Sequence, residues 1–255
     1  MKYPKSPYFD VENHAVLVGY RGSISHGMFI PKERDGIDDK DVMGIIIPPK
    51  RFFYGMGKFE QIEEFVGEWD IVMYEIRKMF RLLVKANPNV LSLLWLDETD
   101  YIKRTSLGDR IIAARDLFVS KAAFHSFTGY AHSQLSQMTR GEFHGYMGEK
   151  RKELVQRYGY DTKNAAHLLR LLRMGREFLV EGKLFVKRKD ARELLDIKMG
   201  LWSLDRVKEQ AEKEFALTNE AYIHSTLPSQ ANNGKIDELL IEIVNEFLNG
   251  NSKEY

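Results

Sequence analysis

The chain has 255 residues, of which 44% are hydrophobic and 29% are charged, and this balance predicts a folded protein rather than a disordered one. The formal net charge of +1 excludes a globally basic nucleic-acid binder but is compatible with a basic face that acidic surfaces balance. The chain has no cysteine, which excludes disulfides and cysteine-ligated zinc. It has no signal-peptide core and no apolar run near the roughly 20 residues that a membrane helix needs. We therefore expect a cytoplasmic protein without a membrane partner.

Three short apolar runs near the N-terminus predict β-strands, over residues 14–20, 42–47 and 69–74. The first run ends at a Gly-Ser turn, Gly22-Ser23, and the second ends at two prolines, because proline cannot continue a strand ladder. Side chains alternate along a strand, so Asp70 in the third run shares a face with Val72 and Tyr74.

Beyond residue 75 the apolar residues recur at helical spacing. A helix from residue 76 ends at Asn87-Pro88-Asn89, a short strand covers 100–104, and further helices are predicted over 90–96, 107–116, 120–139, 148–158, 162–181, 190–197, 204–222 and 236–248. The pattern predicts an α+β fold, with a short mixed sheet and helices in residues 1–105 and a helical domain in residues 106–255.

The turn after the first predicted strand has the features of a phosphate-binding loop. Gly22 lets the backbone approach a ligand closely, Ser23 adds a hydroxyl donor, and a helix predicted from Ile24 would present free N–H groups. A Gly-Ser turn alone is weak evidence, because such turns occur in many loops.

Aspartates cluster at the start of the second predicted strand and recur on the third. Asp39 and Asp41 are two residues apart and therefore share a face, where a bound magnesium ion would relieve their repulsion. Asp70 joins them if the two strands pair. Asp38 offers a second register for the acidic pair, although the spacing favours Asp39 with Asp41. The ordinary alternative is a set of solvated strand ends.

In this order, Gly22-Ser23, Asp39-x-Asp41 and a third aspartate at Asp70 resemble the nucleotidyltransferases of the DNA polymerase β superfamily. The resemblance implies that the N-terminal module is a nucleotidyltransferase head and that the helical domain closes a cleft over it. It also implies that Asp39, Asp41 and Asp70 are catalytic and hold two Mg²⁺ ions, with a nucleoside triphosphate such as ATP as substrate and pyrophosphate as product. Asp70, beside the attacking hydroxyl, is the candidate general base.

Further segments are similar to a narrower branch of that superfamily. They are Asn87-Pro88-Asn89, Phe127–His132 and Tyr158–Gly175, and the similarity extends over roughly residues 14 to 210. This branch consists of bacterial and phage nucleotidyltransferases named for an RNA-repair pathway. The similarity therefore implies a bacterial or phage-encoded protein with an RNA acceptor.

A polar stripe lies on the predicted helix within this region. Lys163, His167 and Arg170 fall at i, i+4 and i+7, so they share one side of the helix. The resemblance implies that the stripe belongs, with Gly22 and Ser23, to a nucleotide-binding set that contacts the triphosphate or an RNA phosphate. The alternative is a solvated basic face with a structural histidine, since further arginines follow on the same helix.

The expected function is Mg²⁺-dependent transfer of a nucleoside monophosphate from a triphosphate to a hydroxyl acceptor, which the resemblance implies to be an RNA end. Three alternatives stay open: a toxin-type enzyme that modifies tRNA or a protein, a small-molecule nucleotidyltransferase, and a non-catalytic nucleotide-binding module. The presence of all three aspartates argues against the last of these.

Overall fold

The computed structural model describes residues 1–31, 38–139 and 149–250. The chain forms two compact units. The first unit contains Met1–Ser25, Asp39–Val119 and Gln230–Tyr255, and the second contains His26–Asp38 and Ser120–Ser229. No helix within the described ranges is both long enough and apolar enough to span a membrane.

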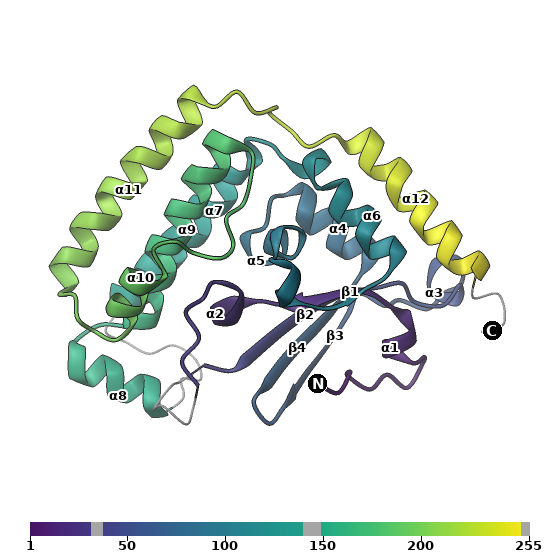
Figure 1. Cartoon of the computed structure of the whole chain (residues 1–255), viewed down its shortest axis with the longest axis horizontal. Helices are drawn as coiled ribbons and strands as arrows, with labels where there is room; N and C mark the ends of the chain where they lie inside the picture. The colour runs from purple at the N-terminus through teal and green to yellow at the C-terminus, as the bar shows by residue number, and fades with distance from the viewer. Residues whose placement is uncertain (32–37, 140–148, 251–255) are drawn as a thin grey trace. The chain divides into compact units, whose positions relative to one another are not determined.

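The first unit is built on a five-stranded sheet with the order β3-β4-β2-β1-β5 (Figure 1). Its strands are β1 (Ala15–Tyr20), β2 (Lys40–Ile46), β3 (Gln61–Val66), β4 (Trp69–Glu75) and β5 (Tyr101–Arg104). β2 and β4 are parallel, whereas the other neighbouring strands are antiparallel. This mixed sheet with its helices confirms the predicted α+β fold class.

One face of this sheet carries a continuous apolar core. Val18, Val42, Ile71 and Met73 are buried there, and the ring of Trp69 packs against them from β4. These positions alternate with residues of the opposite face, as expected for extended strands. The core therefore holds β1, β2 and β4 in one register and fixes the positions of the residues between them.

Helices of the first unit connect and cover the strands. They are α1 (Val11–His14), α2 (Gly22–Ser25), α3 (Arg51–Tyr54), α4 (Ile76–Val84), α5 (Pro88–Leu91), α6 (Ser106–Ala113) and α12 (Asn233–Gly250), with 3₁₀ turns at Ser92–Trp95, Glu98–Asp100 and Arg115–Phe118. α4 begins directly after β4, where the Glu75 side chain accepts a hydrogen bond from the Lys78 N–H and caps the helix. At α6, a side chain on Gly108 would overlap the Val16 carbonyl, so glycine allows the helix to approach β1.

The second unit is helical. It contains α7 (Ala122–Thr139), α8 (Glu149–Tyr158), α9 (Thr162–Glu181), α10 (Ala191–Lys198) and α11 (Leu204–His224) (Figure 1). α9 contacts the other four helices and is its centre. Asp161 caps the N-terminus of α9, and Gly182, with φ +66°, ends it in a left-handed conformation. α8 agrees with the predicted helix, although residue 148 lies outside the described residues.

The boundaries of the two compact units differ from the single domain boundary near residue 105 that the sequence predicted. α6 packs on β1, and α12 packs on α4 and α6, where Arg110 pairs with Glu242 at 2.7 Å and with Glu246 at 2.5 Å. Both helices therefore belong to the sheet unit, and the chain returns to that unit at residue 230. Helical periodicity predicts where a helix lies in the sequence, but it does not identify the element on which the helix packs.

Some short or polar elements were not among the expectations. β3 is an edge strand that is partly exposed over its whole length, and its alternation of polar and apolar residues includes two glutamates. α2 begins at Gly22 rather than at Ile24, and it is a single turn. A helix of this length offers little of the N-terminal dipole on which a phosphate site usually depends.

Candidate active site

Two of the predicted aspartates lie side by side in the sheet. Asp41 in β2 and Asp70 in β4 are directly paired in the parallel register, so their side chains leave the same face of the sheet. Arg21, the residue after β1, lies beside Asp41, because its N–H donates to the Asp41 carbonyl at 2.9 Å. The structure thus brings Asp41 and Asp70 together, as the sequence predicted on the condition that their strands pair.

The Gly-Ser turn lies against the same row. Gly22 has φ +63°, and a side chain there would overlap the Asp41 carboxylate oxygen Oδ2. Ser23 Oγ is buried and has no hydrogen-bond partner among the described residues. A buried hydroxyl without a partner is costly, and an oxygen-rich ligand such as a phosphate would satisfy it.

Arg21 adds a positive charge that sequence analysis did not identify. Its Nη2 donates to Asp70 Oδ2 at 3.0 Å, and both side chains are partly exposed. A guanidinium paired with a carboxylate neutralises part of its charge and orients Asp70. The only signal in the sequence is that Arg21 precedes the turn at a strand end, which is too common to assign a role.

The donor chemistry of this site fits a divalent cation. Asp41 and Asp70 offer hard carboxylate oxygens, which magnesium prefers. The absence of a side chain at Gly22 lets the Gly-Ser turn lie directly against the Asp41 carboxylate. Asp39 directly precedes β2 and is partly exposed. Within the three described ranges, no group of three His, Asp or Glu side chains already lies together as a metal site. The three-carboxylate site therefore stays a prediction.

Asp38 is engaged elsewhere, in the second unit. Its buried carboxylate accepts hydrogen bonds from Lys198 Nζ and, at 3.0 Å, from the Ile30 N–H. Lys163 Nζ lies 3.9 Å from its other oxygen. This arrangement favours the Asp39–Asp41 register over one that uses Asp38. Lys198 had no distinguishing sequence pattern, because a lysine at the end of a helix is ordinarily exposed.

The stripe on α9 is partly exposed at Lys163 and His167 and buried at Arg170. Arg170 is buried, and its guanidinium contacts only the Met174 sulfur at 3.3 Å, while its Nε has no partner within the described part of the chain. Burial, and secondarily the charge of Arg188, lowers the pKa of Arg170 to about 10. Burial, followed by the charges of Arg170 and Lys163, holds the pKa of His167 well below its ordinary value, so its imidazole is neutral at pH 7.

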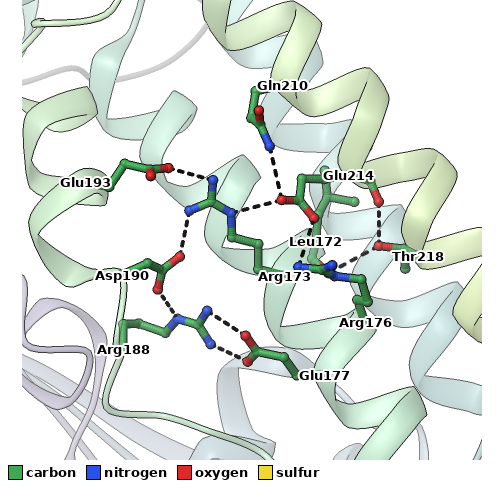
Figure 2. Close-up of polar contacts among 10 residues, drawn as sticks. All are labelled: Leu172, Arg173, Arg176, Glu177, Arg188, Asp190, Glu193, Gln210, Glu214 and Thr218. Carbon is green, nitrogen blue, oxygen red and sulfur yellow. Dashed lines mark hydrogen bonds and ion pairs between the residues drawn. The ribbon is translucent and has the colours of Figure 1, made fainter.

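Arg173, one turn further along α9, shows how the same side chain is satisfied structurally. It donates to Asp190 at 2.6 Å, to Glu193 at 2.6 Å and to Glu214 at 3.1 Å, as Figure 2 shows. Arg188 is likewise paired with Glu177 and Asp190. These contacts connect α9, α10 and α11 and are structural. Arg170 differs because no described carboxylate pairs with it, which leaves it able to bind an anion.

The sequence matches the model of RlaP, described as the RNA repair pathway DNA polymerase beta family, over residues 13–242. A crystal structure of a nucleotidyltransferase-like protein from Exiguobacterium sibiricum 255-15 is similar at 11% identity, over 91% of this chain and 74% of that chain. Its TM-score of 0.29 is too low to support an argument about the site. No curated protein matches the chain. The family match covers most of the chain and confirms the resemblance carried by the motifs. The chain therefore belongs to the RNA repair pathway DNA polymerase beta family.

Proposed function

We propose that the protein is a magnesium-dependent nucleotidyltransferase that transfers a nucleoside monophosphate from a triphosphate, such as ATP, to a hydroxyl at an RNA end. The observation that carries this proposal is the pairing of Asp41 with Asp70 on one face of the sheet, beside the Gly22-Ser23 turn. The family match supports the reaction class, and the RNA acceptor is inferred from the description of the family.

In the proposed reaction, the acceptor hydroxyl oxygen attacks the α-phosphorus and forms a new O–P bond. The bond from that phosphorus to the bridging oxygen breaks in line, and pyrophosphate leaves. Asp70 orients the hydroxyl and accepts its proton, while Arg21 holds the Asp70 carboxylate at 3.0 Å. Asp39, Asp41 and Asp70 would hold two Mg²⁺ ions, which supply charge neutralisation at the triphosphate.

Each unit carries candidate phosphate-binding residues of its own. In the first unit, the Ser23 hydroxyl donates to a phosphate oxygen, and Gly22 lets the turn lie against the Asp41 carboxylate. In the second unit, Lys163, His167 and Arg170 bind phosphate oxygens of the nucleotide or the RNA. Arg170 is buried and forms no ion pair with a described carboxylate, which supports this role, because a bound anion would supply the missing partner.

The proposal is tested by incubating the full chain with each α-labelled nucleoside triphosphate, Mg²⁺ and total RNA, followed by separation of RNA, protein and small molecules. Label in the RNA fraction is expected. Label in tRNA alone or in protein would identify a toxin-type modifying enzyme, and label in a small molecule would identify a different acceptor. Binding of triphosphate without any transfer would contradict the enzymatic proposal.

A pair of variants links the transfer to the predicted site. Asp41→Asn removes one charge with little change of volume, so transfer is expected to disappear while the folded structure persists. Asp116→Asn makes the same chemical change at an exposed residue of a 3₁₀ turn and is expected to behave as wild type. Normal turnover by Asp41→Asn in Mg²⁺ would exclude these carboxylates as the catalytic site.

A further inference from the structure

The row formed by Asp41 and Asp70 extends to β3, the edge strand of the sheet. Phe65 in β3 pairs directly with Asp70 in the antiparallel β3–β4 register, and Asp70 pairs with Asp41. Directly paired residues project to the same face of a sheet. Phe65, Asp70 and Asp41 therefore form one row, with Phe65 next to the proposed general base and on the side away from the Gly-Ser turn.

The ring of Phe65 is available to a ligand. Phe65 is 62% exposed, and no aromatic or cationic side chain contacts its ring among the described residues. The neighbouring aromatic on the opposite face is different, because Trp69 stacks on Tyr20 at 6.4 Å and lies below Lys40. An exposed phenylalanine leaves its apolar surface in water, so covering the ring is favourable.

The hairpin holds Phe65 in place. Every residue of β3 pairs with β4, and Gly67, with φ +64°, forms the tight turn that connects them. Directly opposite Cβ atoms in such a pair are about 5 Å apart. This spacing is comparable to the width of a ribose, so a nucleotide with its hydroxyl at Asp70 has its base within reach of Phe65.

We propose that Phe65 is the acceptor-stacking residue: the base of the acceptor nucleotide lies on its ring while the ribose hydroxyl reaches Asp70. This inference rests on the proposed function and specifies the acceptor as a single-stranded nucleotide end. Stacking on an aromatic ring tolerates all bases, so the acceptor is recognised by an unpaired terminal base rather than by its sequence. Glu63 shares this face through its pairing with Val72, and its charge disfavours phosphate contacts beyond the stacked base.

The test uses a single-stranded oligoribonucleotide with 2-aminopurine at its 3′ end, whose fluorescence is quenched when the base stacks on an aromatic ring. The full chain is titrated into this probe in EDTA, where no transfer occurs. We expect quenching by wild type and by Phe65→Trp. Phe65→Ala is expected to bind the probe about 5- to 150-fold more weakly, which is the usual effect of removing one stacking ring.

The matched control is Val66→Ala at the next residue, which is 43% exposed and pairs with Trp69 on the opposite face. It is expected to retain wild-type quenching. In transfer assays, Phe65→Ala is expected to raise KM for the RNA end while the Kd for triphosphate stays unchanged, and Phe65→Trp is expected to restore KM.

Wild-type binding and KM in Phe65→Ala, or equal losses in Phe65→Ala and Val66→Ala, would overturn the inference. Transfer to protein rather than RNA, with no quenching of the probe, would also overturn it. Because quenching is measured without catalysis, quenching that depends on Phe65 in a chain that transfers nothing would contradict the proposed function alone.

Discussion

At the scale of single residues, Gly22 is required for two separate physical reasons. Its φ of +63° is unfavourable for residues with a side chain, and a Cβ would overlap the Asp41 carboxylate. Gly67 has nearly the same φ, +64°, but nothing lies within 4 Å of the position that its Cβ would take. An alanine at Gly67 would therefore introduce backbone strain alone, whereas an alanine at Gly22 would introduce the same strain and also displace Asp41.

We expect Gly67→Ala to lower the free energy of unfolding by about 1–2 kcal/mol, which is the usual cost of a left-handed alanine. Gly22→Ala is expected to lose at least as much and also to displace Asp41, so that transfer falls more than tenfold. Urea denaturation measures the first effect, and initial transfer rates measure the second. Equal activity of the two variants would show that Gly22 serves the backbone only.

Some residues of the candidate site could be predicted from the sequence, and others could not. Strand alternation is a local rule, so the sequence predicted which residues share a face with Asp70 within its own strand. That Asp70 lies beside Asp41 depended on the pairing of β2 with β4, which the sequence left as a condition. Arg21 and Phe65 could not be predicted, since their roles depend on which strand is the neighbour and in which register it pairs. Arg170 was found by helical spacing, but its burial depends on tertiary packing.

At the scale of elements, α9 carries two arginines with opposite energetic roles. Arg173 is surrounded by three carboxylates, whereas Arg170 is buried without one among the described residues. Removing Arg173 leaves the buried Glu214 with Arg176 as its remaining cation, and it takes one of two arginines away from Asp190. Removing Arg170 instead relieves a buried positive charge with which no described carboxylate forms an ion pair. The two side chains are chemically identical and lie on one helix, so each is the control for the other.

We expect Arg173→Met to lower the free energy of unfolding by about 3–5 kcal/mol. Arg170→Met is expected to keep or increase stability while raising the triphosphate Kd about ten- to hundredfold, because one charge-assisted phosphate contact is lost. Lys163→Ala should act on Kd in the same direction. Chemical denaturation and calorimetric titration measure the two quantities. Wild-type affinity in both Arg170→Met and Lys163→Ala would return α9 to a structural role.

The network between α9 and α10 also predicts how stability depends on pH. Burial alone would raise the pKa of Asp190, but hydrogen bonds from Arg188 and Arg173 outweigh it and lower that pKa below its ordinary value. A carboxylate with a lowered pKa stabilises the folded state above the unfolded-state value of about 3.9, and this contribution is lost as the pH falls through the folded-state value.

Asp190→Asn is therefore expected to be less stable than wild type at pH 7, with a difference that shrinks as the pH falls below about 4. Glu209→Gln removes an exposed acid of α11 and is expected to follow the wild-type curve. Urea denaturation at a series of pH values measures the difference. A difference between Asp190→Asn and wild type that is constant with pH would contradict the proposed role of the ion pairs.

At the scale of the whole molecule, neither compact unit is a continuous piece of chain. The chain leaves the first unit after Ser25, returns at Asp39, leaves again after Val119 and returns at Gln230. Most helix positions followed from local periodicity, but this grouping depends on contacts between distant segments, which local periodicity does not contain. A fragment cut near residue 105 would lose α6 and α12, so tests of ligand binding require the full chain.

Ligand binding to the full chain should raise its thermal stability in two separable parts. A ligand at 100 times its Kd stabilises the folded state by about 2.7 kcal/mol. With ATP and Mg²⁺, we expect a rise in Tm whose metal-dependent part requires Asp41 in the first unit. With ATP in EDTA, a smaller rise is expected, to which Arg170 in the second unit contributes. Asp41→Asn should lose only the first part and Arg170→Met should reduce the second, as measured by differential scanning calorimetry at fixed ligand concentration. A full metal-dependent rise in Asp41→Asn would show that the ion is held by other residues.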